Sequence, residues 1–154
     1  MTTLDRTGAR VLLLDPADRV LLFRGHDPVD AAAGSYWFTV GGGLEPGESA
    51  VDGACRETFE ETGVRLDPAR VVGPLWHETV TFPFNGLTIH QEQHYYLARC
   101  AGSVVDTSGQ EAIEVLCIEH HRWWSLVELE QTKDIVYPTD LAERLRMLLQ
   151  DVRR

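Results

Sequence analysis

The stretch that decides the fold is GGLEPGESAVDGACRETFEETGV, residues 42–64. It follows an apolar segment, Tyr36–Val40, that is typical of a short strand. The glycines at 41–43 are expected to form a loop in which the backbone can approach a ligand or another strand closely. The sequence then predicts a helix over Glu48–Thr62, because Gly63 is typical of a helix C-cap. A strand, a glycine-rich loop and a helix are therefore expected to follow one another here.

The predicted helix separates acidic and apolar side chains onto two faces. With about 100° of rotation per residue, Glu57, Glu60 and Glu61 lie within an arc of about 100°. The face expected to pack on a core is formed by Val51, Cys55 and Phe59. The helix is thus predicted to be amphipathic, with its carboxylates on the face opposite the core.

The acidic face is costly unless something neutralises it. Glu57 makes like-charge pairs with Glu60 and Glu61, and each such pair destabilises a helix by roughly a few tenths of a kcal/mol. Arg56 is the only base in the stretch, which carries −5 of the chain's net charge of −10. Oxygen ligands without His or Cys favour Mg²⁺ or Mn²⁺ as the compensating cation. A solvated acidic helix face is the alternative interpretation.

At these residues the sequence resembles the Nudix hydrolase family. The family pattern is G-x5-E-x7-R-E-U-x-E-E-x-G-U, in which U is a large aliphatic residue. The matching positions are Gly42, Glu48, Arg56, Glu57, Glu60, Glu61, Gly63 and Val64. Thr58 departs from the pattern, because an aliphatic residue is usual at that position.

The resemblance implies an α/β (α+β) fold, an α/β/α sandwich around a mixed β-sheet, with residues 1–154 as a single domain. It also implies a Mg²⁺-dependent hydrolase, with Mn²⁺ as a substitute, that cleaves a pyrophosphate bond in a nucleoside diphosphate linked to another moiety. Water activated by the metal would attack phosphorus. The metal ligands carried over are Glu57, Glu60, Glu61 and a backbone carbonyl at Gly42. Glu48 and Arg56 would form a supporting pair, with Arg56 orienting the carboxylates.

The resemblance does not fix the general base, which must lie within hydrogen-bond reach of the attacking water. Glu57 and Glu61 are candidates from the helix itself. Later candidates are Glu92, Glu111 and Glu114, each with a surface charge as the alternative interpretation. We select Glu114, because it adjoins the apolar run Val115–Ile118. The predicted catalytic residues are therefore Glu48, Arg56, Glu57, Glu61 and Glu114.

Substrate contacts have a weaker signal in the sequence. Aromatic side chains can stack on a nucleobase and Arg can bind phosphate. The predicted contacts are Arg24, Trp37 and Phe82. The alternatives are a core position for either aromatic residue and a solvated strand end for Arg24. Because no downstream signature selects a substrate, a nucleoside triphosphate or a related nucleotide is the default.

The rest of the chain predicts strands with a few helices. Asn85-Gly86 is the strongest hairpin signal and lies between two strand-like runs. The predicted strands are Arg10–Leu14, Arg19–Arg24, Val71–Phe84, Leu87–Cys100 and Val115–Trp124. The further predicted helices are Ser125–Leu129 and Thr139–Val152.

The composition disfavours several classes of protein. The 154 residues include 24 acidic and 14 basic residues, which argues against extended nucleic acid or an anionic membrane as a partner. Three cysteines without CxxC spacing, and no apolar run near ~20 residues, predict a cytoplasmic protein. A small nucleotide is the expected partner, and a homodimer stays open. The alternative function is a catalytically silent Nudix-like nucleotide-binding module, which the retained carboxylates disfavour.

Overall fold

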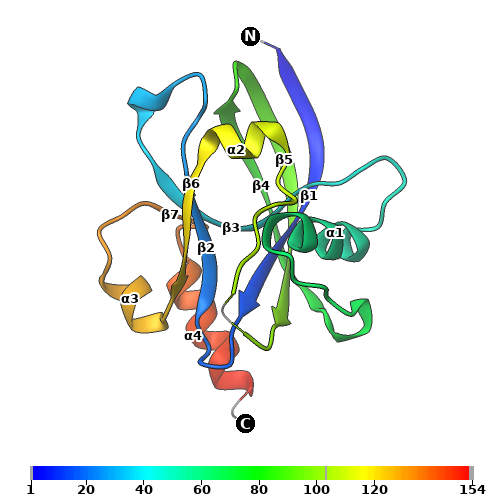
Figure 1. Ribbon diagram of the computed structural model, residues 1–154, viewed down its shortest axis with the longest axis vertical. Helices are drawn as coiled ribbons and strands as arrows, with labels where there is room; N and C mark the ends of the chain where they lie inside the picture. The colour runs from blue at the N-terminus through cyan, green and yellow to red at the C-terminus, as the bar shows by residue number, and fades with distance from the viewer. Residues whose placement is uncertain (1, 103, 153–154) are drawn as a thin grey trace.

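The computed structural model describes residues 2–102 and 104–152, and within them seven strands form one mixed sheet (Figure 1). The strands are β1 Thr3–Leu14, β2 Val20–Gly25, β3 Tyr36–Gly43, β4 Val72–Phe84, β5 Leu87–Arg99, β6 Ile118–Trp124 and β7 Val136–Tyr137. The α-helices are α1 Ala50–Thr62, α2 Ala112–Cys117, α3 Leu126–Gln131 and α4 Leu141–Val152. Two short 3₁₀ helices are η1 Ala31–Ala33 and η2 Pro68–Arg70.

The sheet combines parallel and antiparallel pairs. Its order is β4-β5-β1-β2-β3-β7, with β6 paired to β2 and a further pairing between β1 and β3. β1 runs parallel to β5 along its whole length, from Thr3 opposite Thr88 to Leu14 opposite Arg99. β1 and β3 are antiparallel, with Ala9 opposite Gly42. The predicted mixed sheet is therefore confirmed.

Helices cover both faces of the sheet. Successive residues of a strand point to opposite faces, and Val11 of β1 packs in a cluster with Ala54 of α1. The neighbouring Leu12 instead packs in a cluster with Leu145 of α4. α1 and α4 lie apart with strands between them (Figure 1). The α/β/α sandwich is confirmed, and none of the described helices is long and apolar enough to cross a membrane.

The hairpin between β4 and β5 turns at the predicted dipeptide. Asn85 and Gly86 have φ angles of 51° and 79°, as a tight hairpin turn requires. The turn is also tied to another loop, because the backbone N–H of Asn85 donates to Oδ1 of Asp27 at 2.9 Å. Asp27 follows β2, so this hydrogen bond joins two loops that are distant in the sequence.

Two predicted elements differ from the structure. The glycines at 41–43 do not form a loop but extend β3, because they pair with Gly8–Arg10 of β1 and so give their backbone groups hydrogen-bond partners. The predicted strand Val115–Trp124 begins only at Ile118, and its first residues belong to α2. A capping box between Glu111 and Glu114 starts this helix and outweighs the local strand preference.

The orientation predicted for α1 is right only in part, because Val51 packs against the core as expected but Phe59 does not. Phe59 is 41% exposed, although it was expected to face the core, and the Arg65 guanidinium carbon lies 4.2 Å from the centre of its ring. Ala54, Thr58 and Glu61 are buried instead. Small side chains let α1 approach β3 closely, and Thr58 satisfies its buried hydroxyl by donating to the carbonyl of Ala54 at 2.7 Å. The helix therefore turns part of its acidic face towards the sheet.

Candidate active site

Glu61 is the most deeply buried carboxylate of α1. It is 2% exposed and lies between α1 and β3. Its Oε2 accepts a hydrogen bond from the backbone N–H of Gly41 at 3.2 Å. Because α1 ends at Thr62 with Gly63 as a left-handed C-cap, Glu61 lies in the last turn of the helix. The helix dipole disfavours a negative charge at that end.

Glu57 lies one helical turn earlier and packs on the backbone of β3. A Cβ built on Gly42 would lie 2.8 Å from Oε1 of Glu57. Only a residue without a side chain leaves room for this carboxylate beside the strand. The structure thus gives Gly42 a role as a spacer for Glu57, in addition to the carbonyl contact expected from the family resemblance.

Arg56 links the loop before α1 to the carboxylates of the helix. Its Nε and Nη2 donate to the two carboxylate oxygens of Glu48 at 2.8 and 2.9 Å. Its Nη1 donates to Glu57 at 3.1 Å and to Glu60 at 3.2 Å. A further donation to the carbonyl of Gly43, at 3.1 Å, ties the guanidinium to β3. The predicted Glu48–Arg56 pair is therefore present and is bidentate, a geometry that fixes orientation.

A third carboxylate reaches the cluster from a different element. One oxygen each of Glu57, Glu61 and Glu114 lie within 4.8 Å of one another. Glu114 comes from α2, where the backbone N–H of Glu111 donates to its Oε1 at 3.0 Å. The structure thus brings together the two helix ligands and the later Glu that was selected from the sequence.

The electrostatics of this cluster oppose ionisation. Burial, with the neighbouring Glu114 and Glu60, raises the pKa of Glu57 to about 7, against the opposing effect of Arg56. Burial and the charges of Glu57 and Glu114 raise the pKa of Glu61 well above its usual range. Like charges held together in a poorly solvated site have this effect when no cation is present.

The donor set fits a hard divalent cation. Carboxylate oxygens are the ligands that Mg²⁺ and Mn²⁺ prefer. Glu57 and Glu61 supply them from α1, and the carboxylate of Glu114 from α2 adds a third negative charge beside them. Glu60, the remaining predicted ligand, lies on the same helix with its Oε2 bound to Arg56. A cation among these oxygens would remove the repulsion that raises the pKa values of Glu57 and Glu61.

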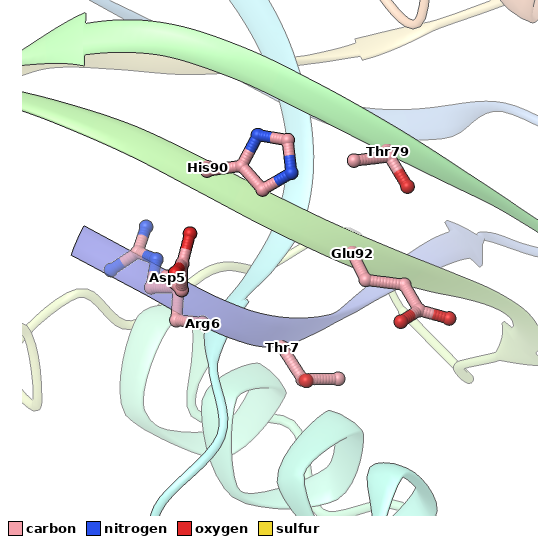
Figure 2. Close-up of a pocket in the computed structure, with 6 residues that line it drawn as sticks. All are labelled: Asp5, Arg6, Thr7, Thr79, His90 and Glu92. Atoms are coloured by element: carbon pink, nitrogen blue, oxygen red, sulfur yellow. The ribbon is translucent and has the colours of Figure 1, made fainter. Parts of the chain in front are cut away.

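The two remaining later candidates for the general base, Glu92 and Glu111, are not among the three convergent carboxylates. Glu111 forms the N-cap of α2. Glu92 is exposed on β5 and lines a shallow hollow of about 320 Å³ over β1, β4 and β5 (Figure 2). The residues around this hollow are Asp5, Arg6, Thr7, Thr79, His90 and Glu92. The hollow therefore contains none of the three convergent carboxylates.

The structure separates the predicted substrate contacts by their burial. Trp37 is 3% exposed and packs in the core against Trp124, with ring centres 5.0 Å apart. Its indole N–H donates to Asp134 at 3.2 Å, so the side chain is fully engaged. Arg24 is half-buried on β2, and Phe82 is half-buried on β4 near the hairpin turn. We retain Arg24 and Phe82 as candidates and assign Trp37 to the core.

Arg10, the first residue of a predicted strand and a possible phosphate contact, lies next to the site in the structure. It donates to the carbonyls of Gly41 and Thr39 at 3.0 and 3.2 Å, and to Oε1 of Gln93 at 3.0 Å. Its charge also lowers the pKa of Glu61 against the effect of burial. The sequence pattern that indicates an inward position for Arg10 is its spacing from Leu12, because residues two apart in a strand point to the same face.

Comparison with known proteins identifies the family to which this chain belongs. The model of the NUDIX domain matches residues 4–145. This chain belongs to the NUDIX family. The match covers the acidic helix, the sheet and α2, so the resemblance inferred from residues 42–64 is confirmed across most of the chain.

Curated relatives of this NUDIX protein are named as phosphohydrolases. An RNA pyrophosphohydrolase of Erythrobacter litoralis is 35% identical over 86 residues, which cover 51% of this chain and 52% of that protein. The human 8-oxo-dGDP phosphatase NUDT18 is 29% identical over 140 residues, covering 88% of this chain and 38% of that protein. The chain therefore spans about half or less of the length of these relatives.

A solved NUDIX structure supports the fold. The MutT protein from Methanosarcina mazei Go1 superposes with a TM-score of 0.62 and covers 100% of this chain and 99% of that chain. Its sequence identity is 18%, so the likeness concerns the fold alone. The α/β/α architecture expected from the resemblance is therefore a NUDIX architecture.

Proposed function

We propose that this chain is a divalent-metal-dependent pyrophosphohydrolase that acts on a nucleoside triphosphate or a related nucleotide. The observation that carries the proposal is the convergence of Glu57, Glu61 and Glu114, whose carboxylate oxygens lie within 4.8 Å of one another. The three negative charges repel one another, and a cation held there would offset this repulsion and the repulsion of a pyrophosphate substrate.

The residues divide into ligands and supports. Glu57, Glu60, Glu61 and the backbone carbonyl of Gly42 would hold Mg²⁺ or Mn²⁺. When bound, the metal supplies Lewis acidity that favours attack of water on phosphorus. Arg56 restricts Glu57 and Glu60 to one orientation through its hydrogen bonds to both, and Glu48 restricts Arg56 in turn.

Glu114 is the proposed general base. It lies on α2, beside Glu57 and Glu61 of α1. It can therefore accept a proton from a water molecule while Glu57 and Glu61 hold the metal. The capping hydrogen bond from Glu111 limits the rotation of its carboxylate. A general base must lie within hydrogen-bond reach of the attacking water, and a fixed carboxylate keeps that distance constant.

The names of the relatives and the net charge of the chain reduce the number of candidate substrate classes. One relative is named for an oxidised guanine nucleotide, which supports small nucleotides, including oxidised ones, as substrates. Another is named for RNA, which makes the 5′ end of RNA the second candidate. The net charge of −10 favours the small nucleotide, because extended RNA would be repelled.

A screen of substrates tests the proposal. Nucleoside triphosphates, oxidised guanine nucleotides, nucleotide sugars, dinucleotides and a 5′-triphosphorylated RNA would be incubated with Mg²⁺ or Mn²⁺, and phosphorylated products quantified. We expect metal-dependent release that falls by about a thousandfold in Glu57→Gln and Glu61→Gln. Glu143→Gln, an exposed change on α4, is the matched control. Nucleotide binding without turnover on every substrate would instead support the silent binding module.

The proposal extends to location and assembly. Cys55, Cys100 and Cys117 are all free thiols, which supports a reducing compartment such as the cytoplasm. A homodimer is proposed from the family resemblance alone. Light scattering on a size-exclusion column would distinguish a dimer from a monomer.

A further inference from the structure

The connection that follows β5 is docked on the C-terminal end of α1. The backbone N–H of Asp106 donates to the carbonyl of Thr62, in the last turn of α1, at 2.8 Å. A Cβ built on Gly63 would lie 2.9 Å from Cβ of Asp106, so the two segments are in close contact there. The path from β5 to α2 is thus fixed against the acidic helix before α2 begins.

A second contact lies at Gly109. This glycine lies in a turn over residues 107–110, in which the N–H of Gln110 donates to the carbonyl of Thr107 at 3.1 Å. A Cβ built on Gly109 would lie 2.8 Å from the carbonyl oxygen of Glu60. That oxygen belongs to the backbone of α1, so it cannot move aside as a flexible side chain would. A side chain at this position would therefore push the turn away from α1.

The far end of α2 is anchored on the sheet. The carbonyl of Cys117 accepts a hydrogen bond from the backbone N–H of His26 at 3.0 Å, and Ile118 then pairs with Gly25 of β2. Glu114 lies between this anchor and Gly109. The distance between α1 and the start of α2 thus determines where the carboxylate of Glu114 lies relative to Glu57 and Glu61.

We propose that Gly109 is a positioning residue of the carboxylate site. Its missing side chain lets the turn rest on the Glu60 carbonyl, and this contact places Glu114 beside Glu57 and Glu61. The inference rests on the proposed metal-dependent function, since it concerns the third carboxylate of that site. Gly109 itself contacts neither metal nor substrate and acts through Glu114.

Gly109→Ala tests the contact, and Gly102→Ala is the matched control. Both glycines lie in the same connection outside the left-handed region, but a Cβ on Gly102 would meet nothing within 4 Å. The negative charge of Glu114 lies beside the proposed ligands Glu57 and Glu61, so it favours a cation there even though Glu114 is the proposed base and not a ligand. Mn²⁺ affinity, measured by electron paramagnetic resonance, is therefore expected to fall about tenfold in Gly109→Ala and to stay unchanged in Gly102→Ala. Because Gly109 lies in an exposed turn, thermal melting should show both variants folded.

A double-mutant cycle decides whether the effect passes through Glu114. In a Glu114→Gln background, Gly109→Ala is expected to cause no further loss of Mn²⁺ affinity or of kcat. An equal loss in both backgrounds, or wild-type Mn²⁺ affinity in Gly109→Ala, would overturn the inference. If the wild-type chain hydrolyses no substrate, the proposed activity fails, while a selective loss of Mn²⁺ affinity in Gly109→Ala still supports the positioning role.

Discussion

Gly42 and Glu57 are in such close contact that a methyl group on Gly42 would lie 2.8 Å from Oε1 of Glu57. The carboxylate of Glu57 therefore lies in the space that a side chain at residue 42 would need. This contact gives a physical reason for a glycine at the start of the acidic motif, separate from any need for an unusual backbone conformation.

Gly42→Ala is expected to displace the Glu57 carboxylate and to reduce turnover by roughly 10- to 100-fold, the range seen when support of a metal ligand is lost. Steady-state kinetics with Mg²⁺ in excess would measure the loss. Gly102→Ala should behave as wild type, because the space around it is open. Equal activity of Gly42→Ala and wild type would contradict the spacer role.

Arg56→Lys should destabilise the fold by roughly 1–3 kcal/mol, because an ammonium cannot replace the fork that binds both oxygens of Glu48. Urea denaturation would give the change in the free energy of unfolding. Arg70→Lys is a suitable control, since Arg70 is 89% exposed and its nearest approach to Asp67 is 4.0 Å. If both variants lose the same stability, the bidentate pair contributes nothing particular.

Stability without metal is expected to fall as the pH rises from about 4.5 to 7. The pKa of Glu57 is about 7 in the folded chain and ordinarily 4.5, so in this interval the folded state keeps a proton that the unfolded state has lost. The raised pKa of Glu61 acts in the same direction. For Glu57 the effect is at most about 3–4 kcal/mol. Urea denaturation in a chelator at several pH values would measure it, and Glu57→Gln should flatten the profile.

Divalent cations should reverse this loss of stability. Because Mg²⁺ or Mn²⁺ would bind the folded carboxylate cluster and not the unfolded chain, a concentration of ~100 times the dissociation constant should add about 2.7 kcal/mol. Melting curves at neutral pH, with sodium chloride at matched ionic strength as the control, would measure the gain. Glu61→Gln should remove most of it. An equal gain from sodium chloride would show that only screening is involved.

Trp37→Phe tests the assignment of this residue to the core. We expect a loss of roughly 1–3 kcal/mol in the free energy of unfolding, from lost packing against Trp124 and the lost hydrogen bond to Asp134. KM should stay within about twofold of wild type, because the ring has almost no exposed surface. A large rise in KM with unchanged stability would return Trp37 to the substrate site.

Features with a local signal were predictable from the sequence. Gly63 ends α1 and Asn85-Gly86 forms the hairpin turn, since in each case the local residue types favour the positive φ angles observed. The spacing of Glu57, Glu60 and Glu61 likewise placed them on one helix face. Their role as candidate metal ligands could therefore be predicted without knowledge of the tertiary structure.

Features set by contacts between distant segments were not predictable. Glu61 is buried against β3, where it accepts a hydrogen bond from the N–H of Gly41, and no pattern within the helix predicts that contact. Phe59 was consequently assigned to the wrong face. Glu114 was selected for its apolar neighbours, whereas its placement follows from a capping box and from how α2 is attached to α1 and β2.

The hydrogen bond between Asn85 and Asp27 couples the lengths of two loops. Lengthening β4 and β5 by two residues each would carry the turn about 7 Å further along the strands, beyond the reach of a side chain as short as Asp. An insertion in the hairpin then keeps this hydrogen bond only with a matching change in the connection after β2. Variation in these two segments should therefore be correlated, although they are more than fifty residues apart in the chain.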